Sequence, residues 1–255
     1  MRRLIGCFVL SLIFLLSLVD CGQKAESTVE RVERTKVLRV GTDATYPPFE
    51  TISIATGQPE GFDIDLITAI CGRLGWKPEF IVTPFDGIIP GLKGSKYDLI
   101  ISAFTMTPER AKEVLFSSPY YDAGQSIAVS LDNVYVRTLG DLKGKRVGVQ
   151  LGTTGERLAK TLAKVEVISF ENIGTAFIDM ENGKLDAVLN DLPTSAKIIM
   201  TRKRAKIVAQ GLSDEKYAMA ARLADAVLVS MIDSAFSQLR QSGLLETLQA
   251  KWFHE

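Results

Sequence analysis

The stretch KYDLIISAF at residues 96–104 indicates the fold class because a close copy of it follows later in the chain. KLDAVLN at 184–190 matches KYDLIIS at 96–102, 88 positions further along. Each copy is an apolar strand that follows a helix and a glycine-containing turn and ends at a small polar residue. LRVGT at 38–42 resembles KRVGV at 145–149 in the same way. We therefore predict two βαβ lobes of similar design, because two distant copies are too few for a solenoid.

The elements around the first copy alternate between strand and helix. In order they are KVLRVGT (36–42), GFDIDLITAICGRLG (61–75), FIVTPF (80–85) and FDGIIPGLKGS (85–95). The second of these is an amphipathic helix with Asp63 or Asp65 near its start and Gly75 just past its end. This alternation predicts an α/β fold in which each lobe is a mostly parallel sheet flanked by helices.

The C-terminal part of the chain is predicted to return to the first lobe. Residues 223–253 form an amphipathic helical stretch that is broken at Gly243. Two strand-like runs, QSIAVS at 125–130 and KYAMAAR at 216–222, flank the second lobe and are predicted to join the lobes. The expected boundaries are residues 36–126 and 218–255 for lobe 1 and residues 127–217 for lobe 2.

The N-terminus has the features of an export signal. Arg2 and Arg3 precede an apolar run that is too short for a membrane span, and residues 1–21 are predicted to be a signal peptide. Cys21 directly follows this segment and resembles the acylated cysteine of a lipobox, although Asp20 stands where a small residue is usual. Acylation at Cys21, soluble periplasmic export and an uncleaved anchor all remain open. Residues 22–35 are polar and typical of a tether.

Composition and charge exclude several classes of function. The 30 basic and 30 acidic residues balance, so bulk charge does not indicate a nucleic-acid partner. The single histidine, His254, lies next to the C-terminus, and no G-x-S-x-G, Walker A or metal-ligand motif is present. Cys71 is the one cysteine of the predicted folded part, and its spacing places it on a buried helix face, so we expect no internal disulfide.

Arg110 stands in an unusual local context. Thr107 and Pro108 predict a helix start, with Thr107 as N-cap, which would place Arg110 in the first turn. A cation there is disfavoured by the helix dipole. From the residues alone, Arg110 either binds an anion or is a surface arginine paired with Glu109 or Glu113.

Polar residues follow the two repeated strands. Ser102–Thr105 ends the first strand and Asn190–Asp191 ends the second. Because ligands collect beyond the carboxyl ends of parallel strands, we expect these segments to face one another across a cleft between the lobes.

Several motifs in register resemble one protein family. They are TDATYPPFE (42–50), GFDIDLITAI (61–70), MTPER (106–110), FSSPYY (116–121), LKGKRVGVQLGTT (142–154) and ND (190–191). Together they closely resemble the periplasmic solute-binding proteins of polar amino acid ABC transporters. The resemblance implies a two-lobed, type II periplasmic-binding fold that captures an amino acid by hinge closure and delivers it to an ABC permease. It also implies a monomer without a cofactor, in the periplasm or at the extracytoplasmic face of the membrane.

The same resemblance assigns the ligand's carboxylate. Arg110 would hold the α-carboxylate in a bidentate grip that lysine cannot supply, and the Thr105 hydroxyl would donate to it. In the second lobe, Thr153, Thr154 and Gly155 match the carboxylate contacts at a helix start, where free N–H groups suit an anion. On local pattern alone, Thr153 or Thr154 is equally a plain N-cap, and the two roles are compatible.

The resemblance implies that Asp191 binds the ligand's ammonium. In the first lobe, Ser102 and the Ala103 carbonyl would complete this ammonium site. From the residues alone, Asp191 is also a candidate N-cap for the helix that follows it. A zwitterion held by both lobes would stabilise the closed state selectively.

The specificity of the pocket depends on three further positions. Tyr46 and Phe85 match residues that flank the ligand side chain, although any single aromatic residue is often simply part of a core. Asp43 would suit arginine or lysine, but this position is also acidic in relatives that bind glutamine. We therefore expect a cationic or amide-bearing amino acid.

Two other classes of function are considered. An enzyme of the same fold, resembling the periplasmic cyclohexadienyl or arogenate dehydratases, would need a carboxylic acid such as Glu156 or Glu171 in the cleft. A sensor ectodomain would need a second membrane segment or an output domain, and the sequence contains neither. We expect a binding protein and no enzyme activity.

Overall fold

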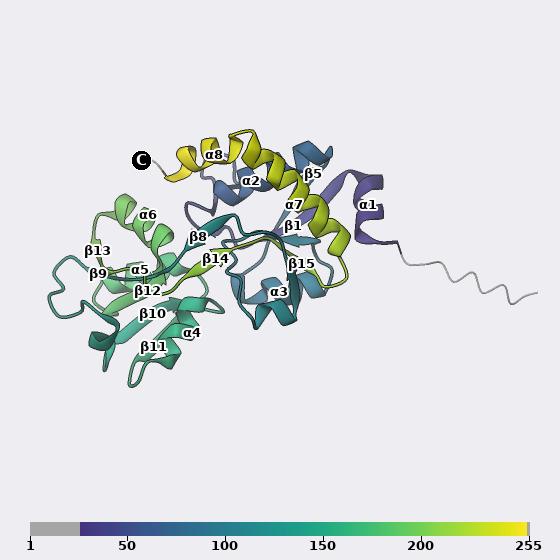
Figure 1. Cartoon of the computed structure of the whole chain (residues 1–255). Coiled ribbons are helices and arrows are strands. Elements are labelled where there is room, and N and C mark those ends of the chain that lie inside the picture. The colour runs from purple at the N-terminus through teal and green to yellow at the C-terminus, as the bar shows by residue number, and fades with distance from the viewer. Residues whose placement is uncertain (1–25, 254–255) are drawn as a thin grey trace, which may run out of the picture.

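The computed structural model describes residues 26–253. The predicted signal peptide and Cys21 lie outside these residues. The helices of the described chain are α1 (Thr28–Thr35), α2 (Phe62–Leu74), α3 (Ile88–Lys93), α4 (Thr154–Thr161), α5 (Ile173–Glu181), α6 (Leu192–Arg202), α7 (Ala226–Gln241) and α8 (Leu244–Phe253), with 3-10 turns η1 (Phe85–Gly87), η2 (Arg110–Lys112) and η3 (Leu139–Leu142). Figure 1 shows two lobes, one carrying α1, α2, α3 and α7 and the other α4, α5 and α6.

Lobe 1 is built on a five-stranded sheet. Its strands, in order across the sheet, are β5 (Lys77–Val82), β1 (Val37–Thr42), β6 (Leu99–Ile100), β15 (Ala220–Arg222) and β7 (Val114–Phe116). The strands β5, β1 and β6 are parallel, whereas β15 is antiparallel to both of its neighbours. A separate short sheet follows β1 in the chain. Its strands are β2 (Thr45–Tyr46), β3 (Glu50–Ile52) and β4 (Pro59–Glu60).

Lobe 2 repeats this design with the same pattern of directions. Its strands, in order, are β11 (Glu166–Phe170), β10 (Arg146–Gln150), β12 (Ala187–Asp191), β9 (Gln125–Ser130) and β13 (Ala205–Ala209). The strands β11, β10 and β12 are parallel, and β9 is antiparallel to β12 and β13. The repeated sequences therefore occupy equivalent places: β1 matches β10, and β6 matches β12. This confirms the predicted α/β fold of two similar lobes.

The local predictions for lobe 1 are mostly confirmed. Helix α2 ends at Gly75, which adopts the left-handed conformation (φ 69°) that glycine accepts without strain. Cys71 is a free, fully buried thiol on the core side of this helix, and burial raises its pKa to about 12. The C-terminal helical stretch is broken at Gly243 between α7 and α8. The strand predicted over 97–104 is shorter, because only Leu99–Ile100 pairs with neighbours.

The strands that cross between the lobes differ from those predicted. QSIAVS forms β9 inside the sheet of lobe 2, and the end of KYAMAAR forms β15 inside the sheet of lobe 1. The crossing is made by β8 (Tyr121–Ala123), which is not part of either predicted run, and by β14 (Glu215–Tyr217), which contains the first two residues of KYAMAAR. The two strands pair antiparallel with each other. Figure 1 shows β8 and β14 side by side between the two lobes. We call them the crossing strands.

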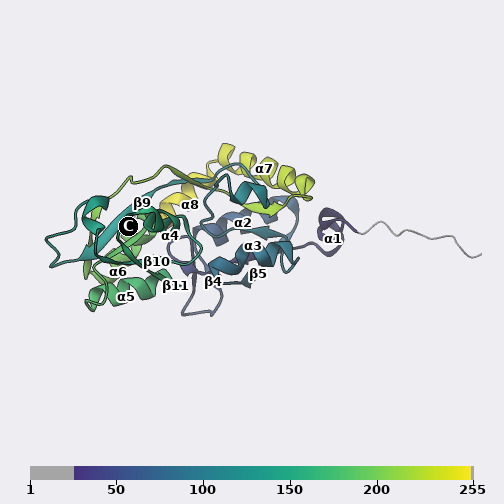
Figure 2. The ribbon, with the colours of Figure 1, turned by 90° about the horizontal axis from the view of Figure 1, so that it is seen from below.

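The segment predicted to be a polar tether is partly a docked helix. Residues 28–35 form α1, which begins with a capping box between Ser27 and Glu30. Val32 is fully buried against lobe 1, and the Trp76 indole donates to Glu33 at 3.2 Å. In both views α1 lies at the end of lobe 1 that is remote from lobe 2 (Figures 1 and 2). Within residues 26–253, no helix combines the length and the apolar character needed to span a membrane.

An arginine–aspartate contact recurs in both lobes. In lobe 1 the Asp98 carboxylate accepts from the backbone N–H of Arg39 at 3.0 Å and from its guanidinium at 2.8 Å. In lobe 2 Asp186 accepts the same donations from Arg146 at 2.8 and 3.1 Å. The two contacts differ in burial, because the Asp98 side chain is 1 % exposed and that of Asp186 is 32 % exposed.

Asp98 also joins distant elements. It contacts Arg31 of α1 and lies 3.3 Å from the guanidinium of Arg222 on β15. Burial acts to raise the pKa of Asp98, but hydrogen bonds from Arg39 and the charge of Arg31 outweigh it, so the net pKa is lowered. One carboxylate thus fastens α1, β1 and β15 together.

We expect Asp98→Asn to destabilise the protein far more than Asp186→Asn. Removing one partner of a buried charge network costs about 3–5 kcal/mol, whereas an exposed pair contributes about 0–1 kcal/mol. Urea denaturation of the two variants measures the difference, and the matched position in lobe 2 is the control. Equal losses in both variants would contradict this account of Asp98.

Candidate functional site

The turn after β6 is held from beneath by buried acidic groups. The Ser102 hydroxyl accepts from the Asp43 backbone N–H at 3.0 Å and donates to Glu50 at 2.7 Å. The Ala103 backbone N–H donates to Asp63 at 2.7 Å. Ala103 adopts φ 43°, a left-handed conformation that is unfavourable for alanine. These contacts fix the turn in a strained shape at the end of the strand.

Glu50 and Asp63 form a fully buried acidic pair under this turn. Burial and then the charge of Asp63 raise the pKa of Glu50 well above its usual range. Burial also raises the pKa of Asp63 to about 7, although hydrogen bonds from the Ala103 N–H and the Tyr120 hydroxyl oppose the shift. Burial therefore disfavours the charged form of both carboxyl groups.

Arg110 is buried between the lobes. Its guanidinium, in a residue only 7 % exposed, donates to the Thr105 carbonyl at 2.7 Å and to the Gly152 carbonyl of lobe 2 at 3.2 Å. It lies 4.3 Å from the ring centroid of Phe104 and 5.3 Å from that of Phe85. Burial, assisted by the charge of Arg157, lowers the pKa of Arg110 to about 10, so the group stays charged at neutral pH.

The surroundings of Arg110 correct two predictions. The helix expected from Thr107 is a single 3-10 turn, because β7 begins at Val114 and leaves no room for further turns. The N-cap of this turn is Glu109 and not Thr107, although the Thr107 hydroxyl accepts from the Arg110 N–H at 3.2 Å. The alternative of a surface arginine is wrong. Of its two proposed partners, Glu109 pairs with Arg157 at 3.1 Å and Glu113 pairs with Lys93 at 3.0 Å.

The start of α4 faces Arg110 from lobe 2. Thr153 is the N-cap, and its hydroxyl accepts from the Glu156 N–H at 3.2 Å. The N–H groups of Thr154 and Gly155 are in the first turn, where an α-helix supplies no internal acceptor. A Cβ on Gly155 would lie 2.8 Å from the Gln125 amide oxygen and 3.2 Å from the Leu189 carbonyl oxygen, so a larger residue would require the Gln125 side chain to shift. The helix start can therefore offer backbone donors to an anion.

Asp191 ends β12 and is buried among donors. Its carboxylate accepts from the Gln125 amide and from the Tyr217 hydroxyl, which belongs to the crossing strand β14. Burial and the charge of Glu215 raise the pKa of Asp191 to about 7. Asp191 is also the N-cap residue of α6, but its side chain makes no capping hydrogen bond. The Asp191 side chain thus points to Gln125 and Tyr217 and does not cap the helix.

Asp43 and Tyr46 reach across from lobe 1 to lobe 2. The Gln150 amide donates to Asp43 at 3.1 Å, and the Tyr46 hydroxyl donates to the Asn190 side chain at 2.7 Å. Burial raises the pKa of Asp43, while hydrogen bonds from Thr45 and Gln150 oppose the shift. These direct contacts show that the two lobes are closed on one another in this structure.

Glu215 also lies among these residues between the lobes, and it was not predicted from the sequence. Its carboxylate accepts from Thr105 of lobe 1 at 2.9 Å and from Thr154 of lobe 2 at 2.7 Å. Gln125 and Gln150 were also not predicted. QSIAVS was recognised as a strand, and its first residue stands opposite Asp191 in the register of β9 and β12, so correct pairing of these strands would have identified Gln125.

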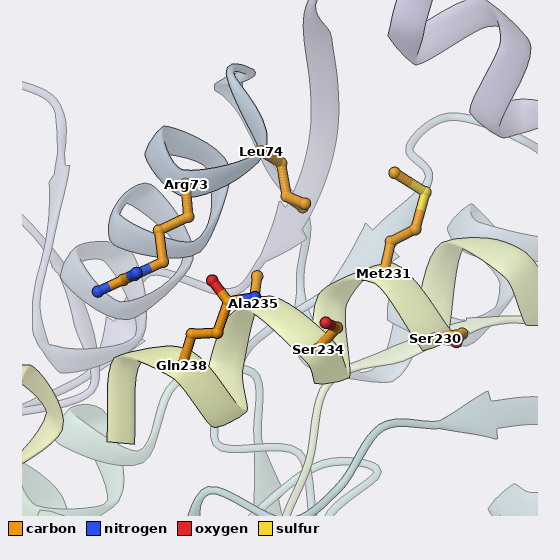
Figure 3. Close-up of a pocket in the computed structure, with 7 residues that line it drawn as sticks. All are labelled: Arg73, Leu74, Ser230, Met231, Ser234, Ala235 and Gln238. Atoms are coloured by element: carbon orange, nitrogen blue, oxygen red, sulfur yellow. The ribbon is translucent and has the colours of Figure 1, made fainter. Parts of the chain in front are cut away.

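A surface hollow of about 260 Å³ lies elsewhere, between α2 and α7 of lobe 1 (Figure 3). Its lining is Arg73, Leu74, Ser230, Met231, Ser234, Ala235 and Gln238, and it contains no predicted site residue. Figure 3 shows the Arg73 guanidinium extending away from Leu74 and Met231. Over residues 26–253, no group of His, Cys, Asp or Glu side chains is arranged to hold a metal ion.

Comparison with known proteins identifies the family. Residues 38–255 match the bacterial extracellular solute-binding proteins, family 3. The chain belongs to this family.

Individual relatives of this solute-binding protein cover most of its length. ABC transporter arginine-binding protein 1 of Escherichia coli (strain K12) is 33 % identical over 222 residues, which is 85 % of this chain and 90 % of the relative. Among solved structures, an ancestral arginine-binding protein bound to arginine is 42 % identical and superimposes with a TM-score of 0.83, covering 86 % of this chain and 98 % of that one.

A third comparison bears on the enzyme alternative. An ancestral amino acid-binding protein that is a precursor of cyclohexadienyl dehydratase is 40 % identical, with a TM-score of 0.84. The match covers 89 % of this chain and 100 % of the ancestral chain. The same fold thus includes a binding protein on a lineage that leads to an enzyme.

We expect the unliganded solute-binding protein to lose stability as pH rises toward neutrality. The pKa of Asp191 is about 7 in the folded state against 3.8 for the free side chain, so between these values the folded state binds a proton that the unfolded state lacks. The free energy of unfolding therefore falls with rising pH, by up to about 1.4 kcal/mol per pH unit for each such group. Above about pH 7, Asp191 is ionised in both states, and its contribution to the free energy of unfolding no longer changes with pH.

Urea denaturation from about pH 5 to about pH 8 measures this dependence. The Asp191→Asn variant has no ionisable group at this position. Its free energy of unfolding should therefore fall less steeply with rising pH than that of the wild type. Asp63, whose pKa is also raised to about 7, remains in both proteins and supplies the common background. Parallel curves for wild type and variant would contradict the raised pKa of Asp191.

Proposed function

We propose that this chain captures a cationic amino acid, arginine foremost, and delivers it to an ABC permease. The observation that carries the proposal is the buried Arg110 guanidinium. Of the ion pairs formed by residues 26–253, none includes Arg110, although the residue is almost fully buried. The charges of Asp191 and Glu215 act on Arg110 only from beyond ion-pair distance. A buried cation without a direct partner is costly, and a ligand carboxylate would supply that partner.

The ligand's two backbone charges would meet opposite charges from different lobes. Arg110 of lobe 1 and the N–H groups of Thr154 and Gly155 in lobe 2 would bind the α-carboxylate. Asp191 of lobe 2, with the Ser102–Ala103 turn of lobe 1, would bind the α-ammonium. Because each charge of the zwitterion is satisfied fully only when the lobes meet, the ligand favours the closed state.

The side-chain end of the site supports a cationic ligand. Asp43 is a buried carboxylate next to Gln150, and Tyr46 and Phe85 supply aromatic surface nearby. A guanidinium could pair with the carboxylate and stack on an aromatic ring. Two of the three relatives compared above are named as arginine-binding proteins, which agrees with this assignment. Glutamine, with a neutral amide, is the next candidate.

A thermal-shift screen of the standard amino acids tests the ligand class. L-Arginine at about 100 times its Kd should stabilise the native state by about 2.7 kcal/mol, because it binds the folded state alone. For a chain of this size that corresponds to a rise in Tm of about 5–10 °C. Lysine, histidine, glutamine, cystine and glutamate are compared in the same screen. A larger shift with L-glutamate than with L-arginine would defeat the cationic assignment.

Substitution of Arg110 tests the carboxylate site. Arg110→Ala should weaken arginine binding by about 2–5 kcal/mol, measured by isothermal titration calorimetry. Arg157→Ala is the matched control: Arg157 is an exposed cation that acts on Arg110 through its charge and pairs with the exposed Glu109, so its removal should cost less than about 1 kcal/mol. Unchanged affinity in Arg110→Ala would remove this residue from the site.

The enzyme alternative finds little support in the two acids considered for it. Glu156 accepts from the Gly152 N–H, Lys160 and Ser169 at 2.9, 2.8 and 2.6 Å. Burial acts to raise its pKa, but these donors outweigh burial and lower it, which is unfavourable for a general acid. Glu171 is exposed. Measurable turnover of prephenate or arogenate would nevertheless overturn the binding-protein assignment.

The remaining expectations concern location and partners. We propose that the protein acts in the periplasm or at the extracytoplasmic face, as a monomer, and that its closed form docks on the permease subunits. Acylation at Cys21 would add an anchor, and more than one acyl chain would be needed for firm attachment.

A further inference from the structure

One oxygen atom of Glu215 is shared by the two lobes. Glu215 Oε2 accepts from the Thr105 hydroxyl of lobe 1 at 2.9 Å and from the Thr154 hydroxyl of lobe 2 at 2.7 Å. Thr105 follows β6, and Thr154 is the first residue of α4. Both donors can reach the same atom only when the lobes are closed together.

The other oxygen fixes the carboxylate in place. Glu215 Oε1 accepts from the Ser213 hydroxyl at 2.8 Å and from the Gln125 amide at 3.2 Å. Glu215 itself lies on the crossing strand β14, where it is paired with Ala123 of β8. The carboxylate is thus held at the junction of the lobes by its own strand, and four donors satisfy its acceptor positions.

These bonds also decide what Thr105 and Thr154 can offer a ligand. A hydroxyl has a single proton to donate, and both threonines direct theirs to Glu215. Their backbone N–H groups are not used in these contacts. Glu215 therefore orients Thr154, whose N–H the proposed carboxylate site uses, without needing to touch the ligand. It also takes the Thr105 hydroxyl proton, which the resemblance assigned to the ligand carboxylate.

We propose that Glu215 is a positioning residue that latches the closed state and slows release of the ligand. The part of this inference that concerns ligand release rests on the proposed function. Opening the lobes separates at least one of the two hydroxyls from Oε2. A buried carboxylate that loses a donor is destabilised, so the open state is disfavoured by this contact whether or not a ligand is bound.

The first test measures release of radiolabelled L-arginine into excess unlabelled arginine. Thr154→Val removes the lobe 2 hydroxyl but keeps the backbone N–H, and it should speed dissociation about tenfold with little change in the association rate. Thr154→Ser keeps the hydroxyl and should restore the wild-type rate. Glu215→Gln, which replaces an acceptor oxygen with a donor, should resemble Thr154→Val.

Ser213→Ala is the matched control for this experiment. It removes a hydrogen bond to the same carboxylate and one from the Gln125 backbone N–H at 3.0 Å, but it breaks no bond between the lobes, so the dissociation rate should stay within about twofold of wild type. Equal dissociation rates in wild type, Thr154→Val and Glu215→Gln would overturn the latch. So would an equal acceleration in Ser213→Ala.

A second test needs no ligand and therefore separates the latch from the proposed function. Small-angle X-ray scattering of the unliganded protein, with the same N-terminus in every variant, reports the radius of gyration. We expect Thr154→Val and Glu215→Gln to be more extended than wild type and Ser213→Ala. Identical radii would overturn the latch. If wild type fails to bind arginine, the ligand assignment fails, while the scattering result still decides the role of Glu215.

Discussion

The pairing of β8 with β14 is the constraint on which the arrangement of the cleft depends. These two short strands belong to neither large sheet, so side chains on them reach both lobes. Tyr217 on β14 donates to Asp191 in lobe 2, and Glu215 on the same strand contacts Thr105 of lobe 1. The crossing strands therefore both connect the lobes and contribute side chains to the binding surface. Movement of the lobes and composition of the site are therefore coupled directly.

In the cleft, Glu215 has four hydrogen-bond donors from the protein, whereas Asp43, Asp191 and Arg110 are the groups that a ligand is proposed to neutralise. Burial raises the pKa of Asp43 and Asp191 and lowers that of Arg110, so the environment disfavours the charged form of each group. A zwitterion with a cationic side chain carries one negative and two positive charges. It would complement one guanidinium and two carboxylates at once. The same groups would oppose a ligand with a second carboxylate, which gives selectivity by repulsion as well as attraction.

The parts of the fold that could be predicted have local signals. Gly75 ends α2 as its sequence indicates, and the repeated strands carry their own apolar pattern. The positions of Arg110 and Asp191 near strand ends could also be predicted, and the resemblance to a known family supplied their roles. Glu215 could not, because its partner Thr105 is 110 positions away and its own neighbours resemble a solvent-exposed turn. The docking of α1 has a weak signal, because Val29 and Val32 are its only core-facing apolar residues in an otherwise polar segment, although Ser27 and Glu30 mark its start.

The place of β15 in the sheet of lobe 1 determines the order in which the protein can be completed during synthesis. This strand, Ala220–Arg222, lies between β6 and β7, both of which precede the whole of lobe 2 in the chain. The sheet of lobe 2 needs only residues from Gln125 to Ala209, so all of its strands are available earlier. Until β15 arrives, β6 and β7 have no strand between them, and their edges stay unpaired on that side. The sheet of lobe 2 can therefore be completed before that of lobe 1.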